Sequence, residues 1–318
     1  MQPDPRPEWP TLFLIAACYG VWALATTALW SVSPLLSLVV ATLAITLLSS
    51  IQHEVLHGHP FRSAVLNEAL VFPAVTLLYP YRRFRDTHLQ HHRDERLTDP
   101  YDDPESNYLD PVVWAGLSRP VQAVLRANNT LLGRLTIGPG LGTVAFWRGD
   151  LRAIRAGDRA VRTAWVLHLL GLLPVVAWFL WVAQMPVWAY LVAVYAGHSI
   201  LKIRTFLEHR AHEKARGRTV IVEGRGPLAF LFLNNNLHVV HHSHPAVAWY
   251  RLPALYAARK AHYLRKNEGY RYASYGEVFR RHFLRAKDPV PHPLMGQAGN
   301  APQPPGRLPD PPIRHAAE

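Results

Sequence analysis

Long uncharged apolar runs alternate with charged segments along this chain, and these runs predict its architecture. Each run is long enough to cross the roughly 30 Å hydrocarbon core of a membrane as a helix. Uncharged turns separate the first run from the second and the third from the fourth. We therefore expect an all-α integral membrane protein whose four transmembrane helices form two hairpins, at about 11–30, 35–51, 165–183 and 187–203.

The remaining segments have other patterns. Residues 64–80 are apolar but shorter, and they contain polar residues and a proline, which favours a re-entrant or interfacial segment. Residues 112–147 mix apolar side chains with arginines and glycines, as amphipathic helices at a membrane surface do. The Pro-rich end, 288–318, has no pattern that would form a core and is expected to be disordered. A single membrane domain then covers 1–287.

The distribution of basic residues indicates which side of the membrane each segment faces. The chain carries 34 lysines and arginines against 22 acidic residues, a formal net charge of +12. Because the basic residues lie outside the short hairpin turns, the positive-inside rule places both termini and a helical cap in the cytoplasm. The four apolar runs exclude a soluble nucleic-acid-binding protein and favour the anionic membrane surface as the partner of this charge. The single cysteine, Cys18, rules out disulfide pairing within the chain and thiolate metal chemistry.

Histidines gather in three clusters just outside the predicted spans. Two clusters have the spacing His-x-x-His-His, and the other has His-x-x-x-His. On a helix these spacings put the imidazoles on one face, where they can converge on one point. Neutral imidazole is a ligand that suits iron, zinc, copper or nickel. The clusters therefore predict metal binding by His53, His57, His88, His91, His92, His238, His241 and His242, the last three on an expected helix over 230–242.

In the order and spacing of these clusters, with two spans between the second and the third, the chain resembles the membrane fatty acid desaturase/hydroxylase superfamily. This superfamily includes acyl-lipid desaturases, alkane hydroxylases and carotenoid ketolases. The resemblance runs from the first span to about His242. It implies two non-haem irons, with O₂ as co-substrate, on the cytoplasmic side of a four-helix stem. It also implies a further ligand after the fourth span, for which His209 in Glu208-His209 is expected and His212 is the substitute.

The number of imidazoles agrees with two metals. One tetrahedral zinc needs only four ligands, whereas nine suit two ions that keep open positions for O₂. Hydrogen-bond acceptors should fix the other nitrogen of the rings. Glu54, Glu208 and Asp99 are candidates, and Asn235 matches a family position near the metal. Helix capping or surface ion pairing is the alternative for the three acids. His59 lies off the ligand face and is left out of the metal set.

The resemblance implies O₂-dependent oxidation of an aliphatic lipid chain, and desaturation of a fatty acyl group is the first expectation. Hydroxylation or ketolation of a lipid, an alkane or a carotenoid at the same site is the alternative. A membrane metal transporter is the more remote alternative. Its site should include ionisable residues inside the spans, and the runs 11–30 and 35–51 contain neither an acid nor a base.

Electrons are expected from a separate protein such as a ferredoxin or a rubredoxin. The chain has no His-Pro-Gly-Gly segment of the kind that would resemble a fused cytochrome b5 domain. The strongly basic region 251–287 has two interpretations. In the first, which the sequence favours, it contacts anionic lipid. In the second, it docks an acidic electron carrier.

Overall fold

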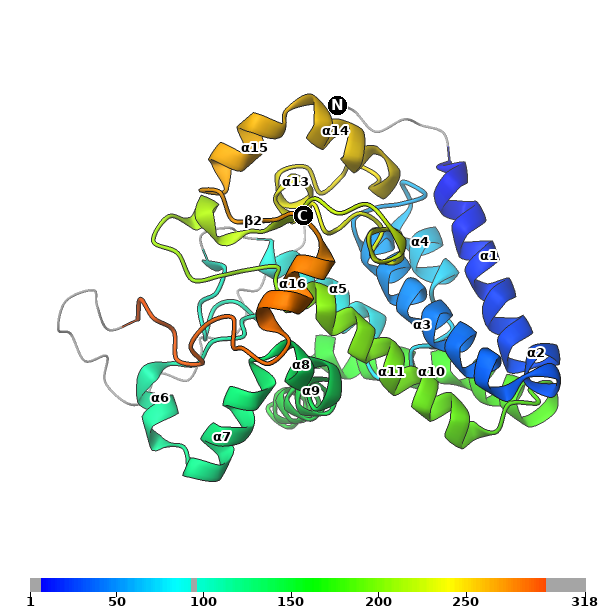
Figure 1. Cartoon of the computed structure of the whole chain (residues 1–318). Helices are drawn as coiled ribbons and strands as arrows, with labels where there is room; N and C mark the ends of the chain where they lie inside the picture. The colour runs from blue at the N-terminus through cyan, green and yellow to red at the C-terminus, as the bar shows by residue number, and fades with distance from the viewer. Residues whose placement is uncertain (1–6, 93–95, 296–318) are drawn as a thin grey trace.

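The computed structural model describes residues 7–92 and 96–295, and this part of the chain is mostly helical (Figure 1). Long helices lie together at one end of the molecule, and shorter helices and loops form a cap at the other. One of the long helices, α1 (Trp9–Thr26), is continued by the short helix α2 (Ala28–Val32). The others are α3 (Pro34–Leu56), α10 (Arg159–Trp181) and α11 (Val187–Thr205).

Within the described residues, three helical stretches are long and apolar enough to cross a membrane, namely Trp9–Val32, α3 and α10. Two of them have clear start signals. Ser33 accepts a hydrogen bond from the backbone N–H of Leu36, and Asp158 accepts one from Val161, as N-cap residues do. The fourth predicted span is also a helix, α11, but it is not one of the three, because it contains more polar residues.

Close packing holds α1, α3 and α11 together. A Cβ added to Gly197 of α11 would lie 2.9 Å from the side chain of Ile45 in α3, so the two helices approach as closely as a glycine allows. Trp22 of α1 donates a hydrogen bond to the hydroxyl of Tyr190, which donates in turn to the carbonyl of Val75. The indole of Trp22 and the hydroxyl of Tyr190 are therefore satisfied within an otherwise apolar core.

The segment 64–80 lies against α10. It consists of the short helix α4 (Ala64–Leu70) and an irregular stretch. The backbone N–H of Ala74 donates to the carbonyl of Gly171, and His168 lies 2.9 Å from the carbonyl of Leu77. These bonds satisfy polar groups of the irregular backbone, which a helix would have satisfied internally.

Four helices occupy the region expected to be amphipathic: α6 (Pro111–Gly116), α7 (Arg119–Asn128), α8 (Leu131–Thr136) and α9 (Gly138–Arg155). Large apolar side chains on them are exposed, including those of Val112, Val121 and Trp147. The segment 111–149 contains arginines but no acidic residue. Exposed apolar side chains next to cations agree with the predicted interfacial role.

The cap begins after α11 and contains a two-stranded parallel sheet. In it β1 (Ile221–Val222) pairs with β2 (Arg271–Tyr272), with Ile221 opposite Arg271. Its helices are α12 (Pro227–Leu231), α13 (His238–Ser243), α14 (Leu252–Ala258), α15 (Lys260–Lys266) and α16 (Tyr275–His282). The beginning of the predicted disordered end contacts the segment before α6, since Leu109 donates to the carbonyl of the buried Val290. Residues 296–318 lie outside the described part of the chain.

The predicted continuous helix over 230–242 is wrong. After α12 the chain turns through Leu233 and Asn234, whose φ angles are 51° and 57°, and α13 begins only at His238. Asn234 donates to the carbonyl of Trp249, and Asn236 donates to that of Val222. Asparagine side chains that bind backbone groups in this way compete with helix formation.

Candidate metal centre

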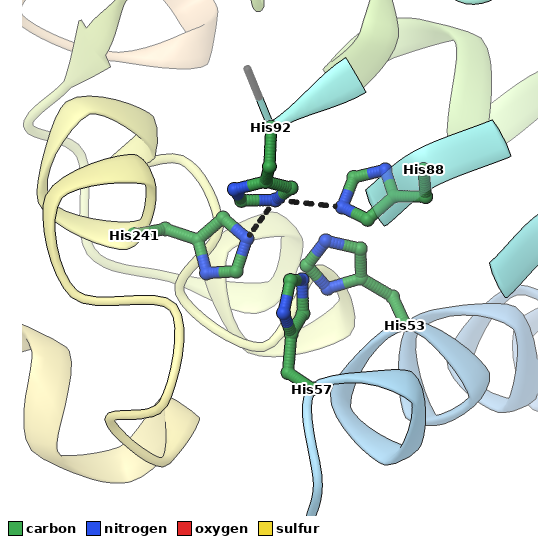
Figure 2. A group of neighbouring side chains, drawn as sticks. All are labelled: His53, His57, His88, His92 and His241. Carbon is green, nitrogen blue, oxygen red and sulfur yellow. Dashed lines mark hydrogen bonds between the residues drawn. The ribbon is translucent and has the colours of Figure 1, made fainter. Parts of the chain in front are cut away.

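The ends of several elements bring the three histidine clusters together in the cap. α3 supplies His53, and His57 follows at its C-terminus. The cluster around His88 lies on α5 (Tyr81–His91) and at its end, and the third lies on α13. Figure 2 shows imidazoles from these three elements pointing toward one another. The clusters, far apart in the sequence, therefore form one buried assembly.

All nine histidines predicted as ligands fall into two groups. Within each group, one nitrogen of every ring lies within 4.8 Å of those of the other members. The first group is drawn in Figure 2 and contains five residues. The second contains four and includes His209, which follows α11. The groups are His53, His57, His88, His92 and His241, and His91, His209, His238 and His242.

The distances between ring nitrogens show whether these groups suit metal ions. In the second group, Nε2 of His209 lies 2.8 Å from Nε2 of His91 and 3.1 Å from Nε2 of His238. In the first group, Nε2 of His92 lies 3.0 Å from His88 and 3.2 Å from His241. Several ring nitrogens thus share one small volume.

Two further ring nitrogens also indicate that the groups can bind metal. Nε2 of His53 and Nε2 of His57 are buried and have no hydrogen-bond partner within the described residues. Buried polar atoms are normally satisfied, and neutral imidazole is a common metal ligand. The donor set therefore fits metal ions.

Acceptors fix the opposite side of three rings. Nδ1 of His91 lies 2.8 Å from Asp103, and Nδ1 of His88 lies 2.9 Å from Glu105. Nδ1 of His238 lies 2.9 Å from Oδ1 of Asn235. A ring that donates from Nδ1 presents the lone pair of Nε2 to a metal. These contacts therefore orient the nitrogens that converge.

Asn235 and Glu208 both lie beside the cluster. The amide of Asn235 donates to Glu208 at 3.3 Å, and Glu208 lies 3.7 Å from Nδ1 of His238. Glu208 also pairs with Arg204 at 2.9 Å. Asn235 thus contacts the ring of His238 directly, and Glu208 contacts both Asn235 and that ring.

Glu54 and Asp99 lie elsewhere. Glu54 accepts a hydrogen bond from the backbone N–H of Trp249, and Asp99 accepts from the backbone of Tyr101 and Asp102. For Asp99 the local capping alternative is therefore the observed arrangement. The sequence did not identify Asp103 and Glu105 as the acceptors for the histidine rings, although both belong to the same acidic segment after the second cluster.

His59 and His212 lie outside both groups. His59 lies between two carboxylates, with Nδ1 2.8 Å from Glu8 and Nε2 3.8 Å from Glu54. Because its two nitrogens face different acids, the ring bridges an ion-paired cluster. The ring of His212 lies against Gly217 and bonds to the backbone of Lys214. His209 is therefore the histidine after α11 that joins the cluster.

Burial and neighbouring charges determine the protonation of the cluster. Burial lowers the pKa of His57, His92, His209, His238 and His241, and neighbouring histidines lower it further. These rings are therefore neutral, as metal ligands must be. His91 differs, because Glu105 and Asp103 outweigh the effect of burial and raise its pKa to about 9. Conversely, His88 and His91 overcome the burial of Glu105 and lower its pKa.

Comparison with known proteins agrees with this geometry. A family model described as fatty acid desaturase matches residues 28–275. The match begins in α2 and ends in α16, so it includes both histidine groups. No curated protein matches the sequence.

Proposed function

This chain belongs to the fatty acid desaturase family, a family of non-haem diiron oxidoreductases, and we propose that it oxidises an aliphatic lipid chain with O₂. Desaturation of a fatty acyl group is the reaction that family membership supports best. The observation that carries the proposal is the pair of buried histidine groups, which holds all nine histidines predicted as ligands. Five imidazoles would hold one iron and four the other.

The overall reaction defines what the protein must supply. Desaturation converts –CH₂–CH₂– and O₂, with two electrons and two protons, into –CH=CH– and two molecules of water. When bound, a pair of reduced irons activates O₂ and supplies the oxidising power to remove hydrogen from an unactivated C–H bond. The protein's contribution is to hold the ligands, exclude water and orient the chain.

Residues of this chain hold the ligands and shield the site from water. Asp103, Glu105 and Asn235 hold three rings in the orientation that turns Nε2 inward. The side chains of His53, His88 and His238 are almost completely buried, and those of the partly exposed histidines lie around them, so most of the cluster is shielded from bulk water. Such shielding limits loss of the oxidant to solvent reactions.

The proposed membrane arrangement has four spans, with α11 as the fourth. The uncharged turn between α10 and α11 then faces away from the cytoplasm, and the cap and both termini face the cytoplasm, as the positive-inside rule requires. A cysteine at the exposed Gln184 should react with a membrane-impermeant maleimide in intact cells, and one at the exposed Arg265 should not. Labelling of both or only of Arg265→Cys would contradict this arrangement.

Product analysis tests the reaction. Cells that express the protein and receive a deuterated fatty acid should accumulate a lipid that has lost two hydrogens per chain, and cells with His241→Ala should not. A product that gains one oxygen atom would instead establish hydroxylation or ketolation, which the Glu208–His209 segment also supports through its likeness to alkane hydroxylases. An unchanged lipid profile in the presence of a competent electron donor would contradict the proposal.

Electrons enter from outside the chain in this proposal. Each turnover needs two of them, and a separate carrier such as a ferredoxin or a rubredoxin would deliver them. The lipid substrate would enter from the membrane in which the apolar helices lie.

A further inference from the structure

The helices α14 and α15 present a basic surface on the outside of the cap. They arch over α13 in Figure 1. No acidic residue occurs between 252 and 267, whereas this stretch contains two arginines and two lysines. The α14–α15 face is defined here by the exposed side chains of Arg259, Lys260, His262 and Arg265, with Lys266 at its edge. Lys260 is paired with Glu223 at 2.6 Å, so the two arginines carry most of the positive charge of this face.

This face lies directly behind the helix that carries three of the predicted ligands. Leu252, Tyr256 and Tyr263 form one hydrophobic cluster with Val239 and Val240 of α13. Such a cluster fixes the two layers against each other. The basic surface is therefore packed, through these side chains, against the helix that carries three of the predicted ligands.

A polar and aromatic path crosses the same layer. Nζ of Lys266 donates to Oγ of Ser243, the last residue of α13, at 2.6 Å. The ring of the buried Tyr263 lies 5.4 Å from that of the exposed His262 and 6.2 Å from that of His244, measured between centroids. His244 follows the ligand His242 by two residues. An electron arriving at this face would therefore reach, through these aromatic rings, a residue two positions from a predicted metal ligand.

The side chains of this face do not suit a lipid surface. Between Phe230 and Phe283, a stretch described throughout, no large hydrophobic side chain is exposed. Helices that bind a membrane surface bury an apolar face in it. Helices α6, α7 and α9 have such exposed apolar residues, among them Val112, Val121 and Trp147. The α14–α15 face has charge without that apolar component, so the lipid interpretation that the sequence favoured fits α6 to α9 better.

We propose that the α14–α15 face is the docking surface for an acidic one-electron carrier protein. The inference rests on the proposed function, which needs two electrons for each O₂ reduced to two molecules of water. A carrier of one electron is oxidised once per encounter and must dock twice per turnover. Its complex must therefore be transient, and complementary charge gives fast association without tight binding.

Binding of a defined probe tests the proposal. A plant-type [2Fe–2S] ferredoxin, which is acidic, is titrated against the full-length protein in nanodiscs of neutral lipid. The test variant is the double substitution Arg259→Glu/Arg265→Glu, since both arginines are exposed. The matched control is Arg119→Glu/Arg126→Glu, which reverses two exposed arginines on α7 and changes the net charge equally.

The expected result is a Kd for ferredoxin that is at least about tenfold weaker in the test variant than in the control. Binding to the wild type should also weaken steeply with added salt, because salt screens exposed charges. In addition, the ratio of ferredoxin-driven to dithionite-driven product formation should fall in the test variant and stay at the wild-type value in the control.

Three results would overturn the proposal. They are equal weakening in both variants, no weakening in either, and a test variant that loses only association with vesicles containing phosphatidylglycerol while it retains ferredoxin binding. The experiment distinguishes failure of this proposal from failure of the proposed function. If no lipid product forms even with dithionite as reductant, the ferredoxin Kd values still decide whether the surface docks the carrier.

Discussion

The imidazole rings of His92 and His242 stack with centroids 4.2 Å apart and an interplanar angle of 15°, although they belong to different histidine groups. The two groups therefore share a boundary. Ions held by them would be neighbours in one buried volume, and a disturbance of one group would be felt by the other. A paired metal centre needs two neighbouring ligand groups of this kind. Substitution of a ligand, or of the residue that accepts a hydrogen bond from it, should therefore change metal binding.

Asp103→Asn should weaken metal binding. The carboxylate lies 2.8 Å from Nδ1 of His91 and accepts from the backbone N–H of Thr98, so it fixes both the ring and the loop beside it. Loss of such an acceptor typically costs about 10- to 100-fold in metal affinity. Metal content after dialysis against a graded chelator measures the change.

Asp99→Asn is the matched control, because Asp99 caps the following turn. It should retain the wild-type metal content at chelator concentrations that empty Asp103→Asn. Equal metal loss in the two variants would show that the loop as a whole, rather than the contact with His91, controls the metal.

His209→Ala should remove metal from one group preferentially. Nε2 of His209 lies within hydrogen-bond distance of Nε2 of both His91 and His238. The second group would keep only three imidazoles, and the iron content should fall from about two to about one per chain, since a site that loses a ligand binds its metal less tightly. His212→Ala should leave the iron content unchanged, and a comparable loss there would refute the assignment of His209.

Glu223→Gln should lower the melting temperature in a pH-dependent way. Burial alone would raise the pKa of Glu223, but hydrogen bonds from Lys260, Tyr256 and Arg271 outweigh it and lower the pKa to about 2 from its usual 4.5. The ionised form is therefore favoured by folding, and its stabilisation is complete above pH 4.5 and lost as the pH falls toward 2.

The melting temperatures of wild type and Glu223→Gln in detergent, compared across this range, test the sign. Their difference should be largest above pH 4.5 and shrink in acid. A difference that grows as the pH falls would mean that the carboxylate is not stabilised by its three partners.

Gly171→Ala should destabilise the contact between α10 and the segment before α5. A Cβ at this position would overlap the carbonyl oxygen of Phe72, a backbone atom that cannot move away alone. Overpacking of this kind costs about 1 to 3 kcal/mol. Gly20→Ala is the control, because nothing lies within 4 Å of the added Cβ. A melting temperature of Gly171→Ala equal to that of Gly20→Ala would contradict the described packing.

The sequence predicted those parts of the molecule that depend on local pattern. Three of the four apolar runs correspond to helices long and apolar enough to span a membrane, because length and hydropathy are properties of a segment by itself. The histidine spacing identified eight of the nine members of the two groups, since a convergent set of ligands repeats a helical period. The ninth, His209, was expected only from the family resemblance.

Contacts that depend on chain folding could not be predicted in the same way. Asp103 and Glu105 reach His91 and His88 only because the segment after α5 turns back on it, and a run of acids gives no sign of which one does so. The irregular start of α13 depends on asparagine bonds to the distant Trp249 and Val222. The role of Glu54 likewise depends on the distant Trp249, whose backbone it binds.

Iron analysis of the detergent-purified protein tests the central claim most directly, with His241→Ala measured in parallel. His241 lies 3.2 Å from His92 and close to His53 and His57 in the first group. The account predicts about two irons per chain in the wild type, as two separate groups of ligands imply, and a sharp decrease in His241→Ala. A single zinc, or no iron together with an unchanged metal content in the variant, would contradict it.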